Sequence, residues 1–223
     1  MARELKSERR GAPKGTAKQV VVFVHGYGAD GADLLGLAEP LAPHLPDTAF
    51  YSPDAPEKCV GNPFGYQWFP IPWLDGSKEE DAKASMAASV EDLNAFLDKV
   101  LEEEGLTADR LALVGFSQGT MMSLHIAPRR DVAIGALVGF SGRLLEPENL
   151  AAEAKVKIPV LLLHGDQDVM VPFASLKEAA DRLVATGFET YAFVMKGTGH
   201  GIAPDGLGQA VGFLRMKLGL EES

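Results

Sequence analysis

Short runs of apolar residues recur along this chain and predict the strands of a buried sheet. They span residues 20–24, 48–51, 111–116, 136–140, 160–164 and 191–195. Most of these runs are continuous rather than alternating, which is typical of parallel strands that are covered on both faces. The sequence therefore predicts a largely parallel central sheet.

Between these runs, apolar residues recur at the three- and four-residue spacing of amphipathic helices. The longest such pattern starts with a capping box at residues 77–80 and stops at Gly105. Shorter helices are predicted over about 34–38, 120–126, 176–184 and 207–218. Strands that alternate with helices indicate an α/β fold with helices on both faces of the sheet. No repeat or linker interrupts the alternation, so we expect one domain over residues 19–223 without a large cap domain.

The stretch G115-F-S-Q-G119 joins a predicted strand to a predicted helix. Such a tight turn, called a nucleophile elbow, exposes its serine, here Ser117, in a strained backbone conformation. It requires small residues two positions before and after the serine. Gly115 and Gly119 meet that requirement. The helix begins beneath the serine, so its first N–H groups and positive dipole end point at any oxyanion formed there. We therefore predict that Ser117 is a nucleophile.

Two further polar residues follow predicted strands and should lie at the same edge of the sheet as Ser117. Asp168 comes after the strand at 160–164, and His200 comes after the strand at 191–195. In parallel α/β sheets, ligands bind at the carboxyl ends of the strands. A serine hydroxyl needs a base, an imidazole can take and return its proton near neutral pH, and a carboxylate orients that imidazole. The sequence thus predicts a Ser117–His200–Asp168 triad, in the chain order of α/β-hydrolases.

Other acidic and imidazole groups compete for these roles. Asp166 lies two residues before the predicted triad aspartate and is expected to cap the turn. His25 and His164 follow or end strands and are expected to act as structural hydrogen-bonding groups. His125 lies on the helix after the elbow and is expected to be a packing residue. No metal-ligand spacing appears, so we expect neither a metal nor another cofactor.

A glycine-rich loop over residues 25–33 follows the first predicted strand of the sheet. It is interpreted as an oxyanion loop, in which the backbone N–H groups of Tyr27 and Gln118 would hold the charged oxygen. An ordinary strand-to-helix turn and a phosphate loop are the alternatives, although the lysine of a P-loop is missing. We assign no catalytic role to the side chain of Gln118.

A second loop spans residues 52–76 and is rich in proline, glycine and aromatic residues, so we call it the aromatic loop. A loop of this length is more often functional than idle. It either forms an apolar wall over a substrate pocket or packs on itself to seal the sheet edge. The candidate substrate-binding residues are Trp68, Phe69 and Trp73 from this loop, with Val169 and Met170 after the triad aspartate.

Charge and cysteine content narrow the classes of function. The net charge of -10 argues against nucleic acid or an anionic membrane as the main partner, since both attract positive charge. The single cysteine, Cys59, excludes an internal disulfide, fits a reducing compartment and lacks the elbow of a nucleophile. No apolar run approaches the roughly 20 residues of a membrane span. We therefore expect a cytoplasmic protein without stable membrane association.

Residues 1–18 are polar, basic and contain glycine and proline. They have no apolar core behind their charges, so they do not form a secretory signal. We expect a basic, partly ordered arm that can be flexible, and a binding tail is the alternative.

Four sequence blocks together resemble one known family. They are residues 23–33 (F-V-H-G-Y-G-A-D-G-A-D), 115–119, 164–172 (H-G-D-Q-D-V-M-V-P) and 199–200. In order and spacing they are similar to the carboxylesterase and acyl-protein thioesterase family of α/β-hydrolases, and more so to its bacterial esterase branch. The resemblance implies the same triad and oxyanion residues, hydrolysis of carboxylic esters without a cofactor, and a homodimer as one assembly. Thr120 and Gly201 depart from the family pattern of glycine and glutamate at these positions.

Three hypotheses follow from the sequence. The first is a serine carboxylesterase that acts on small to medium acyl esters through an acyl-enzyme. The second keeps this chemistry but makes the protein an acyl-protein thioesterase or a lysophospholipase. The third is a non-catalytic binding protein with a hydrolase fold, and the complete set of triad residues argues against it.

Overall fold

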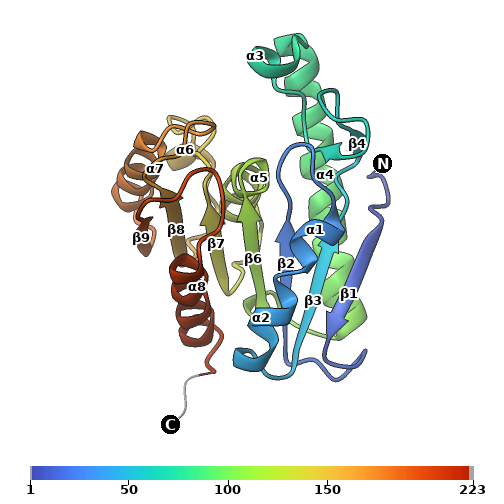
Figure 1. The fold of residues 1–223 in the computed structure, drawn as a ribbon. Coiled ribbons are helices and arrows are strands. Elements are labelled where there is room, and N and C mark those ends of the chain that lie inside the picture. The colour runs from blue at the N-terminus through green and yellow to red at the C-terminus, as the bar shows by residue number, and fades with distance from the viewer. Residues whose placement is uncertain (1, 221–223) are drawn as a thin grey trace.

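The strands that the apolar runs predict lie side by side in one sheet. In this computed structural model, which describes residues 2–220, the seven-stranded sheet has the order β1-β3-β2-β6-β7-β8-β9 (Figure 1). The strands are β1 (Ser7–Gly11), β2 (Gln19–Val24), β3 (Thr48–Pro53), β6 (Leu111–Phe116), β7 (Ala136–Phe140), β8 (Val160–Gly165) and β9 (Thr190–Met195). All neighbours pair in parallel except β1, which is antiparallel to β3. The predicted α/β sheet is confirmed, while residue 1 of the predicted arm and residues 221–223 of the predicted domain lie outside the described residues.

Helices cover both faces of the sheet, as predicted. The α5 face carries α4 (Glu79–Glu104), α5 (Gln118–Ile126) and α7 (Ala174–Ala185), and the α8 face carries α1 (Gly31–Leu35), α2 (Ala38–Leu41) and α8 (Pro204–Lys217). The connections hold α3 (Pro72–Asp75), α6 (Leu150–Glu153), a β4–β5 hairpin (Glu57–Lys58 with Tyr66–Gln67) and 3-10 turns at Ala42–His44, Ala108–Arg110 and Ala127–Arg129. Across residues 2–220, no helix combines the length and apolarity needed to cross a membrane.

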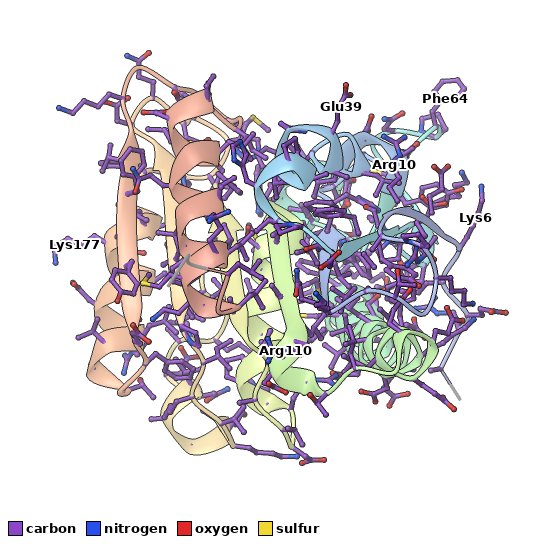
Figure 2. The ribbon with its side chains drawn as sticks, turned by 90° about the horizontal axis from the view of Figure 1, so that it is seen from below. Lys6, Arg10, Glu39, Phe64, Arg110 and Lys177 are labelled. Carbon is purple, nitrogen blue, oxygen red and sulfur yellow. The ribbon has the colours of Figure 1, made fainter. Side chains whose placement is uncertain are left out.

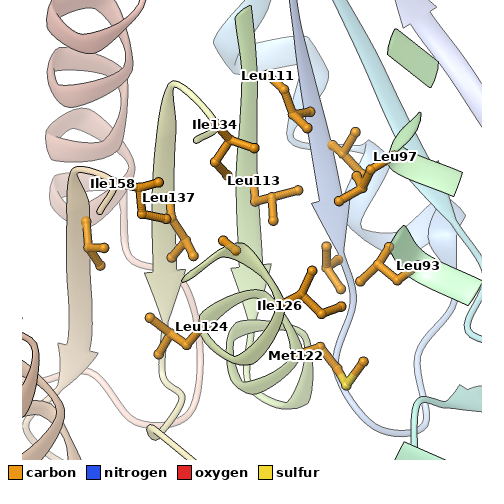
Figure 3. Packing of buried hydrophobic residues seen from close by; sticks show 14 of the residues in the cluster. Leu93, Leu97, Leu111, Leu113, Met122, Leu124, Ile126, Ile134, Leu137 and Ile158 are labelled. Carbon is orange, nitrogen blue, oxygen red and sulfur yellow. The ribbon is translucent and has the colours of Figure 1, made fainter. Parts of the chain in front are cut away.

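Two separate apolar cores form because successive residues of a strand point to opposite faces of the sheet. On β6, Leu111 and Leu113 pack with Met122 of α5 and with the apolar side of α4 (Figure 3). Ala112 and Val114 of the same strand pack into the core of the α8 face. Both faces are thus filled by helices, and the carboxyl edge of the sheet is left to the loops.

The N-terminal segment differs from the arm that the sequence predicts over residues 1–18. Ser7–Gly11 form β1, which pairs with β3 and closes one edge of the sheet. Arg9 donates through Nε and Nη2 to Glu104 Oε1 and Oε2 of α4, at 2.7 and 3.1 Å. The hydroxyl of Tyr51 donates to the same carboxylate at 2.6 Å. A basic residue of the predicted arm therefore neutralises a buried carboxylate and holds the segment against the sheet.

Replacing Arg9 by methionine is expected to lower the free energy of unfolding by about 3 kcal/mol, because it leaves a buried carboxylate without its counter-charge. The Glu104 side chain has no exposed surface. Burial alone would raise the pKa of Glu104, but the hydrogen bonds from Arg9 and Tyr51 outweigh it and lower that pKa. Urea unfolding at pH 7 measures the loss.

The matched control is Arg10→Met, on the same strand but exposed to solvent (Figure 2). It should change the stability by less than about 0.5 kcal/mol. A carboxylate with a lowered pKa stabilises the fold above its ordinary pKa of 4.5 and loses that contribution as the pH falls through its folded value. The deficit of Arg9→Met should therefore shrink in acid. Equal stability of the two variants at pH 7 would contradict the role of Arg9.

The start of α4 also differs from the sequence prediction. The sequence predicts a capping box at residues 77–80, but α4 begins at Glu79, with Lys78 in the cap position and no side-chain cap bond. The backbone N–H of Ser77 instead donates to Asp75 Oδ1 at 2.9 Å. The end of the helix is as predicted, since Gly105 has a φ of 67° and closes the last turn. The preceding loop, rather than a serine cap, sets where α4 begins.

Candidate active site

The turn between β6 and α5 holds Ser117 in a conformation that few non-glycine residues adopt. Its φ is 53° and its ψ is -115°, and such backbone strain is concentrated at functional sites. A Cβ on Gly115 would lie 2.6 Å from the backbone nitrogen of Thr120, and a Cβ on Gly119 would overlap the carbonyl oxygen of Val24. Strand and helix therefore approach as closely as the predicted elbow requires. The first turn of α5 directs its free N–H groups toward the carboxyl edge of the sheet.

Asp168 and His200 meet at that same edge. His200 Nδ1 lies 2.8 Å from Asp168 Oδ2, and because a carboxylate can only accept, Nδ1 carries the proton and Nε2 is left with a lone pair. Asp168 Oδ1 accepts from the backbone N–H groups of Met170 and Val171, each at 2.9 Å. Burial alone would raise the pKa of Asp168, but the hydrogen bonds from His200 and Val171 outweigh it and lower that pKa. The carboxylate is thus held ionised and aimed at the imidazole.

The imidazole of His200 packs directly beside the elbow. Its ring centroid lies 4.9 Å from that of Phe116, the residue before Ser117. About 21% of the His200 side chain is exposed, whereas the Asp168 side chain has no exposed surface. One group can therefore exchange protons with a bound molecule while the other is shielded from water.

His164 contributes to this site in a way that the sequence did not predict. Its Nε2 lies 3.2 Å from Asp168 Oδ2 and 3.0 Å from the carbonyl oxygen of Val171. Both neighbours are acceptors, so Nε2 carries a proton that they share. The predicted structural role as a hydrogen-bonding group is correct, but one partner is the carboxylate that orients His200. The only sequence signal is its position four residues before Asp168 at the end of an apolar run.

The predicted oxyanion loop is fastened to the aromatic loop by the side chain of Tyr27. The hydroxyl donates to Asp75 Oδ2 at 3.0 Å and accepts from the backbone N–H of Gly61 at 3.1 Å. Burial, followed by the neighbouring thiol of Cys59, raises the pKa of Tyr27. The backbone N–H of Gly28 donates to the carbonyl oxygen of Tyr66 at 2.8 Å. The Tyr27 backbone N–H is thus carried by a loop that three hydrogen bonds hold to the aromatic loop.

The side chain of Gln118 holds the same aromatic loop from the other side. Its Oε1 accepts from the backbone N–H of Trp68 at 2.9 Å, and its Nε2 donates to the carbonyl oxygen of Phe69 at 2.7 Å. The sequence predicts no catalytic role for this side chain, and it does not predict this positioning role. Both residues whose N–H groups are candidate oxyanion donors therefore position the loop over the site.

Trp68 seals the fold rather than lining a pocket, which corrects the sequence prediction. Its side chain has no exposed surface, and its Nε1 donates to the carbonyl oxygen of His25 at 2.9 Å. Phe69 and Trp73 do line a groove of about 270 Å³ over the α5 face. The two alternatives for this loop both apply, because its middle seals the sheet and its later part forms an apolar wall.

The last two candidate substrate-binding residues, Met170 and Val169, differ in their position relative to this groove. Met170 lines it, whereas Val169 is 90% exposed and lies outside its wall, so a substrate-binding role for Val169 stays a prediction. Met121 of α5, four residues after the elbow serine, also lines the groove, so the groove extends to α5. The other lining residues are Pro70, Ile71, Pro72, Glu79, Ala82, Lys83, Met86, Arg143, Leu145, Glu146, Val171 and Pro172. A larger hollow of about 690 Å³ between residues 143–147 and α7 includes none of the triad or oxyanion residues.

Two of the competing residues, Asp166 and His25, have backbone partners. Asp166 Oδ1 accepts from the backbone N–H of Gly197 at 2.7 Å, so it binds the turn after β9 instead of the turn that contains Asp166 itself, which corrects the predicted cap. His25 uses both ring nitrogens in bonds to the backbone, at Gly26 and Ala55. Within residues 2–220, no group of three His, Cys, Asp or Glu side chains is arranged to hold a metal ion.

Known proteins are similar to this chain in both sequence and architecture. A family model described as phospholipase/carboxylesterase matches residues 8–218. The crystal structure of esterase PE8 has a TM-score of 0.90 and 41% sequence identity, and the match covers 96% of this chain and 100% of that one.

Curated relatives match over most of their length as well. Acyl-protein thioesterase 1 of Saccharomyces cerevisiae is 30% identical, over 91% of this chain and 94% of its own. Esterase YpfH of Escherichia coli is 27% identical, over 86% of this chain and 79% of its own. Because the family model spans nearly the whole sheet and all the site residues above, the chain belongs to the phospholipase/carboxylesterase family of α/β-hydrolases.

Proposed function

We propose that the protein is a serine carboxylesterase that hydrolyses small to medium acyl esters through an acyl-enzyme. The observation that carries this proposal is the 2.8 Å bond between Asp168 and His200 beside the strained elbow of Ser117. Family membership and the relatives named esterases support the same chemistry. The apolar groove next to the elbow provides the surface for an acyl chain.

The reaction uses each group in turn. His200 Nε2 takes the hydroxyl proton of Ser117 as Oγ attacks the ester carbonyl carbon. The charged oxygen of the tetrahedral intermediate is held by the backbone N–H groups of Tyr27 and Gln118. His200 returns the proton to the leaving oxygen, the alcohol departs, and water then cleaves the acyl-enzyme by the same steps. Asp168 keeps the imidazole in the tautomer that this sequence requires.

A fluorophosphonate probe tests the proposal directly, because it forms a covalent bond only with an activated serine. We expect intact-protein mass spectrometry to show addition of one probe, and peptide mapping to place it on Ser117. Prior denaturation in urea should abolish labelling, since the base is then no longer positioned. Labelling at another serine, or none in active protein, would contradict the assignment.

A thioesterase or lysophospholipase is the second candidate, and one feature of the surface favours it. Trp73, Leu74 and Met170 beside the groove are 68%, 45% and 48% exposed, so they present apolar surface to a long acyl chain. Several relatives are also named acyl-protein thioesterases. Relative kcat/KM values for acyl thioesters, lysophospholipids and short esters separate this candidate from the first.

A further inference from the structure

Two hollows flank the elbow on opposite faces of the sheet. The groove described above contains Phe69 and Met86, which pack against the core of the α5 face. A second hollow of about 280 Å³ contains Leu34, Phe116 and Ile202, which pack against the core of the α8 face. Ser117 follows β6, the central strand of the sheet. A molecule bound at the elbow can therefore extend toward the hollow on either face.

The second hollow adjoins the reacting groups. Its wall includes Gly26, where a Cβ would lie 3.3 Å from the Cβ of Ser117. Phe116 forms another wall and packs against the imidazole of His200, and Ile202 comes two residues after that imidazole. The hollow is therefore bounded by the immediate neighbours of the nucleophile and of the base.

Proton transfer from His200 to the leaving oxygen indicates which hollow holds the alcohol part of an ester and which holds the acyl part. The leaving oxygen must lie within hydrogen-bond reach of His200 Nε2 when it takes the proton. The hollow on the α8 face is walled by the residues that adjoin this imidazole, and the acyl-sized apolar groove lies on the other face. We propose that the α8-face hollow is the leaving-group site, which holds the alcohol part of the ester. This inference rests on the proposed esterase function and adds a substrate class to it.

The walls of the hollow define the chemistry of that alcohol. Leu34, Phe116 and Ile202 are apolar, so they favour an alcohol with a hydrocarbon surface. The ring of His25 is uncharged, because its Nε2 accepts from the N–H of Ala55 while its Nδ1 donates to the carbonyl oxygen of Gly26.

Asp33 supplies the charge of the hollow. Its carboxylate lines the wall, is exposed, and forms no ion pair within residues 2–220. The site therefore favours alcohols with an apolar surface that are uncharged or cationic, and it disfavours anionic ones.

Two substrate series separate the leaving-group site from the acyl groove. In the first, acetate esters of methanol to hexanol vary the alcohol only, and all give the same acetyl-enzyme. In the second, p-nitrophenyl acetate to octanoate vary the acyl chain only. For Leu34→Phe, which narrows the hollow, we expect kcat/KM of hexyl acetate relative to methyl acetate to fall about tenfold. Leu34→Ala should shift the same ratio in the opposite direction, and it keeps the test available if Leu34→Phe does not fold.

The matched control is Met170→Phe in the groove on the opposite face. It should change the dependence on acyl length and leave the dependence on alcohol length as in the wild type. Leu34 variants should do the reverse. Hydrolysis of the common acetyl-enzyme, followed by burst kinetics, should stay unchanged in the Leu34 variants, because the alcohol has left before that step.

Charge is tested with a pair of esters of the same shape, acetylcholine and 3,3-dimethylbutyl acetate. Asp33→Asn should lower the kcat/KM ratio of the cationic to the neutral ester by about two- to fivefold, the size expected for an exposed charge. An unchanged ratio would overturn the role of Asp33. Leu34 variants that alter the acyl series but not the alcohol series would overturn the site itself. Absence of turnover by the wild type on both series, with no probe labelling, would instead overturn the proposed esterase function.

Discussion

Replacing Ser117 by alanine is expected to lower kcat for a p-nitrophenyl ester by roughly 10⁴- to 10⁶-fold, the range for loss of a serine nucleophile. The change removes one oxygen atom and leaves the elbow intact. Alanine is under the same backbone strain as serine at a φ of 53°, so the thermal unfolding midpoint should stay close to that of the wild type. KM should change little, because the groove and the oxyanion donors remain. Steady-state kinetics and circular dichroism measure these effects.

Ser123→Ala is the matched control, because it removes a hydroxyl from the same helix, from a side chain that bonds to the helix backbone rather than to a substrate. Ser123 Oγ donates to the carbonyl oxygen of Gly119 at 2.8 Å within α5. A bond of this kind contributes about 1 kcal/mol to stability and takes no part in the chemistry. Wild-type kcat in Ser117→Ala, or an equal loss in both variants, would show that the elbow serine is not the nucleophile.

The strands and the elbow could be predicted from the sequence because their signals are local. Most of the continuous apolar runs reflect burial on both faces of the sheet, and helices cover both faces. The run at 191–195 is the exception, because it forms the edge strand β9, where Tyr191 and Val194 are exposed and only Met195 is buried. The two glycines of the elbow are required by contacts that any such turn makes, so a five-residue pattern carries them. His200 and Asp168 could be placed because parallel strands bring their loops to one edge.

The edge strand β1 could not be predicted, because its reason lies far away in the chain. Ser7–Gly11 contain no apolar side chain, so no hydrophobic pattern marks a strand. Their order comes from pairing with β3 and from the bond between Arg9 and Glu104, which is 95 residues further on. The charge of these residues alone predicts a solvated arm. The bond from Arg9 to the buried carboxylate of Glu104 explains why the segment lies against the sheet instead.

The aromatic loop shows a similar limit. Composition marks Trp68 and Trp73 alike, yet one has no exposed surface and the other is 68% exposed. Gln118 contributes to the difference, because its amide binds the backbone N–H of Trp68 and the carbonyl oxygen of Phe69. The indole of Trp68 adds a bond to the carbonyl oxygen of His25. An amide with one donor and one acceptor group can fix a peptide in this way, but nothing in the sequence pairs it with a loop 50 residues earlier.

Replacing Asp168 by asparagine is expected to lower kcat by roughly 10⁴-fold while KM stays near the wild-type value. The amide keeps the shape of the carboxylate, and its oxygen can still accept from the N–H groups of Met170 and Val171. Its NH₂ group would face His200 Nδ1 and force the proton of the imidazole onto Nε2. Nε2, which the proposed mechanism uses as the base, would then have no lone pair to accept the proton of Ser117. Steady-state kinetics of the folded variant measure the loss.

Asp166→Asn provides the control, because it makes the same chemical change two residues earlier. Asp166 is exposed, and among the residues that the structure describes its carboxylate accepts only from the backbone N–H of Gly197, a bond that an amide oxygen can also accept. Its kcat should therefore remain within about twofold of the wild type, as for most surface substitutions. Nitrogen NMR of the imidazole should show the proton on Nδ1 of His200 in Asp166→Asn and on Nε2 in Asp168→Asn. If both variants lost activity equally, or if Asp168→Asn kept the wild-type tautomer, the carboxylate would serve to fold the loop rather than to orient the base.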